Sequence, residues 1–99
     1  MEEAKIALHV NDKDNVATIF ANGITDGTEV EIRDRRGECL PVRVIGDVPY
    51  GHKIAVKDIP RGQLVIKYGE EIGIATQDIR RGEYVRVHNM DSLRGRGDL

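Results

Sequence analysis

The sequence has no tryptophan, one phenylalanine and one cysteine in 99 residues. Cys39 therefore cannot form an internal disulfide, and a lone thiol is typical of proteins from a reducing compartment. No apolar run approaches the roughly 20 residues needed to cross a bilayer. The acidic start, Met-Glu-Glu-Ala, is unlike the basic start of a signal peptide. We expect a cytoplasmic protein that makes no contact with a membrane.

An excess of positive charge is also missing. Fifteen lysines and arginines face 17 aspartates and glutamates, which gives a formal net charge of −2. A domain that binds phosphates usually carries a basic excess on one face. The richest arginine segment, residues 33–36, is interleaved with acidic residues and largely neutralises itself. The charge pattern therefore predicts no nucleic-acid partner.

The apolar runs are short, and eleven glycines separate them. Six runs are typical of strands: residues 6–10, 16–20, 30–33, 42–44, 64–68 and 84–88. No window of eleven or more residues has the 3.6-residue period of an amphipathic helix. We predict an all-β domain, mainly β with short helical turns and an aliphatic core, over residues 1–90. A flexible C-terminal tail is expected over residues 91–99.

An internal repeat is the most informative feature of the sequence. Residues 55–65 match residues 75–85 at an offset of twenty, and residues 24–30 are a fainter copy. We expect each copy to form a short turn in which the aspartate caps its own turn, the isoleucine enters the core and the glycine takes an unusual backbone angle. Because two or three copies are too few for a solenoid, the repeat predicts a compact pseudo-symmetric fold.

Three further phrases accompany the repeat: Gly51-His52-Lys53, Ile66-Lys67-Tyr68-Gly69 and Val87-His88-Asn89. In this order and spacing, the series resembles the antifreeze-like SAF domain at the N-terminus of altronate and galactarate dehydratases. It is also similar to the small subunit of sulfolactate sulfo-lyase. The resemblance covers residues 6–89 and implies a β-clip fold.

The resemblance draws attention to His52, which lies in a predicted turn after Gly51. A lone histidine in a turn is most often an ordinary solvated residue, but this one matches the family's Gly-His-Lys phrase. His52 is therefore a candidate catalytic residue. Lys53 could supply a positive charge for a substrate carboxylate, or it could end a strand and face the solvent.

His88 is expected to close the last predicted strand, next to Asn89. In the dehydratases this segment usually reads His-x-His-Asn, and two imidazoles on one strand face could share a divalent cation. Here Arg86 takes the first position. Arginine cannot bind a metal ion as a ligand, but it binds carboxylates bidentately. The resemblance thus leaves His88 as a second catalytic candidate and makes Arg86 and Asn89 candidates for substrate binding.

The resemblance implies a hydro-lyase that removes water across C2 and C3 of a sugar acid such as altronate or galactarate. In this family a divalent metal, iron or manganese, stabilises the developing charge, and His52 and His88 are the candidate ligands. The family's large catalytic body is missing from these 99 residues. We therefore expect a small subunit or N-terminal domain that is active only with a large dehydratase subunit, and whose two histidines face the partner's active site.

Two alternatives stay open. The chain could be the small subunit of a sulfolactate sulfo-lyase, in which sulfite rather than water leaves and Arg86 receives the sulfonate. It could also be a non-catalytic SAF binding module, because such domains cover the substrate site in sialic acid synthases.

Overall fold

The computed structural model describes residues 5–93. Its strands are β1 (Ile6–His9), β2 (Val16–Ile19), β3 (Glu29–Asp34), β4 (Cys39–Arg43), β5 (Lys53–Ala55), β6 (Leu64–Lys67), β7 (Glu70–Ala75), β8 (Tyr84–Val85) and β9 (Met90–Ser92). No helix occurs among these residues. The prediction of an all-β domain is confirmed.

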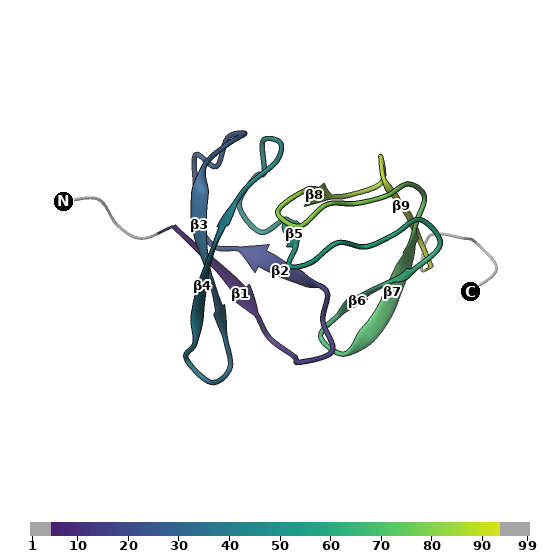
Figure 1. Ribbon diagram of the computed structural model, residues 1–99, viewed down its shortest axis with the longest axis horizontal. Helices are drawn as coiled ribbons and strands as arrows, with labels where there is room; N and C mark the ends of the chain where they lie inside the picture. The colour runs from purple at the N-terminus through teal and green to yellow at the C-terminus, as the bar shows by residue number, and fades with distance from the viewer. Residues whose placement is uncertain (1–4, 94–99) are drawn as a thin grey trace.

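The strands form two sheets. The larger has the order β4-β3-β1-β2-β5-β8, and the smaller has the order β6-β7-β9. β1 pairs with β3 in parallel, and the other pairs are antiparallel. Figure 1 shows β1, β3 and β4 at one end of the molecule, β6, β7 and β9 at the other, and β5 and β8 between them. Residues 53–55 and 84–85 are therefore central to the fold although both strands are short.

Three strands, β5, β7 and β9, were not expected from the sequence. The buried positions of β7 are Gly73 and Ala75, which give no strong period-two hydrophobic signal. A Cβ atom at Gly73 would lie 2.6 Å from the carbonyl oxygen of Asp91 and 2.7 Å from Cγ of Met90. Small residues are required in β7 because β9 packs against it. The signal of this strand therefore depends on a partner far along the sequence.

The core is aliphatic, as the composition predicted. One cluster of buried residues lies on the larger sheet and includes Ile19, Val30 and Ile54. A second cluster combines residues of both sheets, including Val16 of β2 and Val65 of β6. This second cluster holds the smaller sheet against the larger one.

The second cluster contains the two copies of the repeat. Ile59 and Ile79 are each 1% exposed and exchange two backbone hydrogen bonds of 2.8 and 2.9 Å. Farther along the two copies, Gly62 and Gly82 occupy equivalent positions, and their φ angles are 88° and 89°. The copies are thus related by an approximate two-fold axis. The predicted roles of the isoleucines and glycines are confirmed.

The predicted role of the repeated aspartates is wrong in one respect. Asp58 Oδ1 accepts a hydrogen bond from the amide of Arg81 (2.8 Å), and Asp78 Oδ1 accepts one from the amide of Arg61 (2.9 Å). Each aspartate therefore caps the turn of the other copy rather than its own. The reason is the two-fold arrangement, which brings each aspartate beside the opposite turn. Asp26 of the fainter copy likewise accepts from a distant amide, that of Gly46 (2.8 Å).

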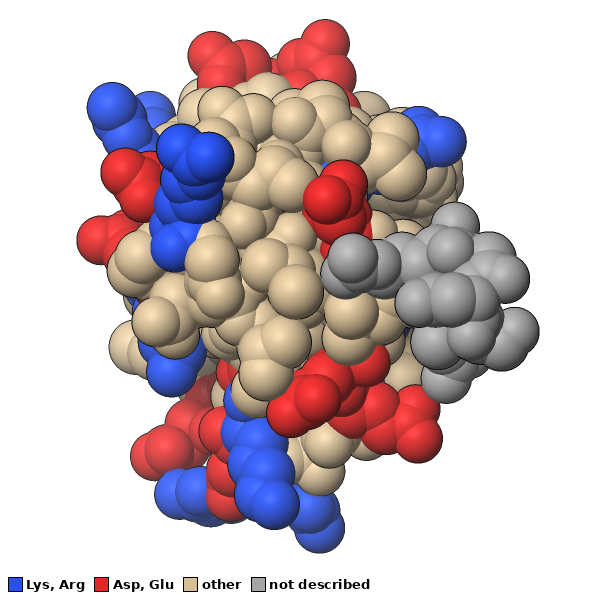
Figure 2. Space-filling view, turned by 90° about the vertical axis from the view of Figure 1, so that its right-hand side faces the viewer, with Lys and Arg blue, Asp and Glu red and all other residues tan. Residues whose placement is uncertain are grey.

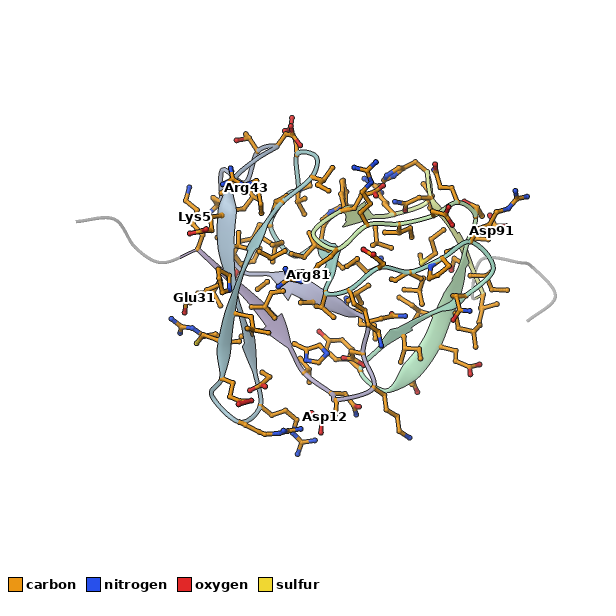
Figure 3. All side chains as sticks on the ribbon, viewed as in Figure 1. Lys5, Asp12, Glu31, Arg43, Arg81 and Asp91 are labelled. Carbon is orange, nitrogen blue, oxygen red and sulfur yellow. The ribbon has the colours of Figure 1, made fainter. Side chains whose placement is uncertain are left out.

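The turn of the second copy is also tied to β4. Figure 3 shows Arg81 near the centre of the view. Its guanidinium donates to the carbonyl oxygens of Pro41 (3.1 Å) and Val56 (3.2 Å). The backbone of Gly82 packs against the same strand, since a Cβ atom there would lie 2.3 Å from the carbonyl oxygen of Arg43.

A buried acidic residue joins the two sheets on the other side. The carboxylate of Asp14, which is 4% exposed, accepts hydrogen bonds from the amides of Asn11, Tyr68 and Gly69. Asn15 donates to the carbonyl of Leu64 at 2.8 Å. These bonds fasten the β6–β7 hairpin to the turn between β1 and β2.

The C-terminal boundary lies beyond the predicted one. β9 includes Asp91 and Ser92, which the sequence assigned to the tail, because the buried Met90 pairs with Ala75 and brings the next residues into the sheet. Residues 94–99 of the predicted tail lie outside the described residues. In the described part of the chain there is no helix that could cross a bilayer.

Figure 2 shows the end of the molecule formed by the smaller sheet. Uncharged side chains occupy the centre of this face, and charged side chains of both signs surround it.

Candidate functional site

His52 is presented by a tight turn that leads into β5. The amide of His52 donates to the carbonyl of Pro49 at 3.1 Å, and Gly51 has a φ angle of 83°. A Cβ atom at Gly51 would meet nothing within 4 Å. The glycine is therefore needed for its backbone angle rather than for the close approach of another group. The carbonyl of His52 accepts the amide of Ile19 at 2.8 Å, which fixes the turn to β2.

The imidazole of His52 meets Tyr84 of β8. Nδ1 of His52 lies 2.5 Å from Oη of Tyr84, and the two ring centroids are 5.6 Å apart. The contact follows from the sheet register, because Ile54 pairs with Tyr84 and Lys53 pairs with Val85. The residue just before β5 thus comes beside the side chain that begins β8.

His88 contacts the same tyrosine. Its ring centroid lies 5.7 Å from that of Tyr84. The prediction of a strand over residues 84–88 is wrong in its second half, because β8 ends at Val85 and residues 86–89 form a turn. This turn, rather than strand alternation, brings His88 back over Tyr84. His52 and His88 therefore both contact the ring of Tyr84.

Asn89 shapes this turn from within. Its side chain is completely buried, its Oδ1 accepts the amide of Arg86 (2.9 Å), and its Nδ2 donates to the carbonyl of Tyr84 (2.9 Å). Nδ2 also donates to a carboxylate oxygen of Glu83 (3.3 Å). A substrate cannot reach this side chain in the structure. We therefore correct the expected substrate-binding role of Asn89 to one of holding the turn.

Three cationic residues bring positive charge to this part of the domain. Nη1 of the exposed Arg86 donates to Oη of Tyr84 at 3.4 Å. Lys53 is half-buried, and burial holds its pKa below the ordinary value, with further lowering by the charges of Lys67 and Arg86. Three elements, β5, β6 and the turn after β8, thus bring positive charges near one another. Such a cluster favours binding of an anion, because an anion would relieve the mutual repulsion.

The sequence of the described residues matches a known family. Residues 5–93 match the family described as the altronate/galactarate dehydratase SAF domain. The chain belongs to this family.

The relatives of this SAF domain include both separate subunits and long enzymes. It is 35% identical over 88 residues to the (2R)-sulfolactate sulfo-lyase subunit alpha of Chromohalobacter salexigens, with 86% of this chain and 93% of that protein covered. It is 43% identical over 76 residues to the altronate dehydratase of Escherichia coli, with 77% of this chain and 14% of that protein covered. It is 40% identical over 79 residues to the galactarate dehydratase (L-threo-forming) of the same organism, with 79% and 14% covered. The chain thus spans about a seventh of the dehydratases.

Within residues 5–93 of the SAF domain, no three metal-ligating side chains come together. His52 and His88 can each offer one imidazole nitrogen, but the described residues do not form a complete metal site. The third histidine, His9, is used elsewhere, because its Nε2 bonds the carbonyl of Asp14 at 2.7 Å.

Two residues of this site were missed by the sequence. Tyr84 looked like an ordinary strand residue, and only the pairing of β5 with β8 shows that it contacts His52. Lys67 was noted as part of a family phrase, but its charge influences Lys53 through the fold. Both residues lie in segments that the family resemblance covers, and that resemblance is the sequence signal that could have identified them.

Proposed function

We propose that this SAF domain forms one wall of the active site of a lyase, a hydro-lyase that dehydrates a sugar acid of the altronate or galactarate type. The observation that carries the proposal is the placement of His52 and His88 around one tyrosine, beside the cations Lys53 and Arg86. In a member of this family, such a group can bind an acidic substrate and also move protons.

The chemistry of dehydration explains the residue types. The proton on C2 is weakly acidic because the neighbouring carboxylate is already negative, and removing it adds charge to the C1–C2 unit. The guanidinium of Arg86 can bind the carboxylate bidentately, and Lys53 can stabilise the added charge. Imidazoles can take the C2 proton and donate to the hydroxyl that leaves C3, since histidine gains and loses protons near neutral pH. Loss of both groups gives an enol that becomes the 2-keto-3-deoxy acid.

The proposed enzyme needs a second, larger chain or domain. The long dehydratases extend far beyond the part matched here, and the described residues offer no complete metal site. We propose that a large catalytic subunit completes the site and supplies most ligands of any iron or manganese ion. A bound divalent metal would polarise the carboxylate and hydroxyl of the substrate. We place the enzyme in the cytoplasm, where the exposed thiol of Cys39, the sole cysteine, stays reduced.

A sulfo-lyase is the second candidate, and one observation favours it. The chain covers 93% of a relative named (2R)-sulfolactate sulfo-lyase subunit alpha, so a separate chain of this size occurs in that enzyme. The elimination is related, because a C2 proton is removed beside a carboxylate while sulfite leaves C3. Arg86 could then bind the sulfonate.

Reconstitution tests the proposal. The full chain is mixed with the dehydratase-like or sulfo-lyase-like large chain of the same organism and supplied with Fe²⁺ or Mn²⁺. Altronate, galactarate and sulfolactate are offered separately, and both keto acid and sulfite are measured. We expect keto acid without sulfite from a sugar acid, and only from the mixture. Sulfite release would select the second candidate, and no effect of this chain on any turnover would support a non-catalytic binding module.

A further inference from the structure

We infer that Tyr84 is a positioning residue that holds the imidazole of His52 and leaves its Nε2–H as the group presented to the substrate. In its catalytic part, this inference rests on the proposed function. The structural part concerns the SAF domain alone and can be measured without a partner.

The tyrosine is a fixed platform. Its amide donates to the carbonyl of Ile45 at 3.1 Å, and its carbonyl accepts Nδ2 of the buried Asn89 at 2.9 Å. Its side chain is half-buried, and its Cβ lies 3.5 Å from the position of a Cβ at Gly46. The backbone and Cβ of Tyr84 are therefore fixed by these bonds and by a neighbouring turn, which fixes the position from which the phenol ring extends.

The hydroxyl decides which nitrogen of His52 is available. Oη of Tyr84 bonds Nδ1 at 2.5 Å, whereas no group within residues 5–93 bonds Nε2. Arg86 donates a hydrogen bond to the same Oη at 3.4 Å. The hydroxyl of Tyr84 cannot donate its proton to Arg86, because arginine has no hydrogen-bond acceptor. The hydroxyl oxygen therefore accepts from the guanidinium, and the hydroxyl proton is donated to Nδ1 of His52. The neutral imidazole then carries its proton on Nε2.

This arrangement divides the work between the two histidines. With Nδ1 engaged and a proton on Nε2, neutral His52 is a hydrogen-bond donor suited to the oxygen that leaves C3. His88 contacts the ring of Tyr84 without a bond to its hydroxyl, and its carbonyl accepts Nε2 of Gln77 at 2.9 Å. Its imidazole thus remains available to take the C2 proton.

Histidine side-chain NMR on the full chain tests the structural part. Long-range ¹H–¹⁵N correlation is recorded at roughly pH 8, above the ordinary titration range of histidine. We expect the Nε2–H tautomer for His52 in the wild type, and a shift of its Nδ1 resonance in Tyr84→Phe. The signals of His88 should keep their positions, because the ring is retained. Tyr68→Phe is the matched control, since Tyr68 contacts Lys67 through its ring, 5.1 Å from Nζ; it should leave His52 unchanged.

An Nδ1–H tautomer in the wild type would overturn the inference, and this measurement needs no variant to fold. Unchanged His52 signals in a folded Tyr84→Phe protein would overturn it as well. In the reconstituted enzyme, Tyr84→Phe should lower kcat about tenfold with KM nearly unchanged, as is typical when the partner of a working histidine is removed. An unchanged kcat would refute the catalytic part. Should the tautomer be as expected while no mixture turns over any substrate, the proposed function fails and the structural part stands.

Discussion

Replacing the two repeated glycines gives a controlled test of the fold. Gly62 and Gly82 occupy equivalent positions with φ angles of 88° and 89°, so alanine at either position suffers the same backbone strain. Their surroundings differ. A Cβ at Gly62 meets nothing within 4 Å, whereas a Cβ at Gly82 would lie 2.3 Å from the carbonyl oxygen of Arg43 and 3.1 Å from Cγ2 of Val42.

The expected losses follow from these distances. A non-glycine residue in the left-handed region costs roughly 1–2 kcal/mol, and the reduced freedom of the unfolded chain returns about 0.4–1 kcal/mol. Gly62→Ala should therefore lower the free energy of unfolding by about 1 kcal/mol. Gly82→Ala adds an overlap with backbone, and overpacking typically costs a further 1–3 kcal/mol or more. The amide and carbonyl of Gly82 bond Ala55 and Ile45, so the turn cannot move away without losing these bonds. A total loss of about 2–4 kcal/mol is expected.

Urea unfolding followed by far-UV circular dichroism measures both variants against the wild type. For a domain of this size, 1 kcal/mol corresponds to about 4–8 °C in Tm. Gly62→Ala should thus remain folded at room temperature, and Gly82→Ala should be severely destabilised or unfolded. Losses equal within about 0.5 kcal/mol, or a larger loss for Gly62→Ala, would refute the packing of the second repeat against β4.

Three further predictions concern the site and its support. His52→Ala and His88→Ala should each lower the rate of the reconstituted enzyme by roughly 10²-fold or more. Because His88 is exposed, His88→Ala should change the free energy of unfolding by less than about 0.5 kcal/mol. Full activity of both variants would contradict their roles. Asp14→Ala should lower the free energy of unfolding by about 2–4 kcal/mol, because three amides lose a charged acceptor. The control in the same urea assay is Asp12→Ala, because Asp12 is exposed. Lys53 should titrate below its ordinary value of 10.5 in a ¹³C NMR titration, because burial and two cations lower its pKa. The unfolded chain binds the Lys53 proton more tightly than the folded chain does. The charged lysine therefore destabilises the folded state at pH values below its folded pKa, and this destabilisation is relieved as the pH rises from that pKa towards 10.5. An added dicarboxylate should raise this pKa. Titration of Lys53 at its ordinary value would contradict the cationic cluster.

The repeat shows how far the sequence determines the fold. Its pattern correctly predicts buried Ile59 and Ile79 and glycines with unusual backbone angles, because these requirements are local. It fails for Asp58 and Asp78, because a carboxylate can cap any amide that the fold brings near it. The choice between a residue's own turn and the opposite one depends on the two-fold arrangement, which no local pattern contains.

The site shows the same division. The resemblance picks out His52 and His88, and in the structure both contact the ring of Tyr84. Their link through Tyr84 depends on the register between β5 and β8, two strands of three and two residues. Asn89 was predicted as a substrate-binding residue from its place in a phrase, yet it is fully buried in the turn. Burial of a polar residue next to a functional one cannot be read from spacing alone.

The central claim is that this SAF domain completes the active site of a lyase formed with a larger chain. The most direct test is the rate of keto acid formation from altronate or galactarate by the large chain, measured as the full 99-residue chain is titrated into it. The account predicts no turnover by either component alone, a rise that saturates with added chain, and a plateau at least about 10²-fold lower with His52→Ala. A large chain that is fully active alone and indifferent to the added chain would contradict the account.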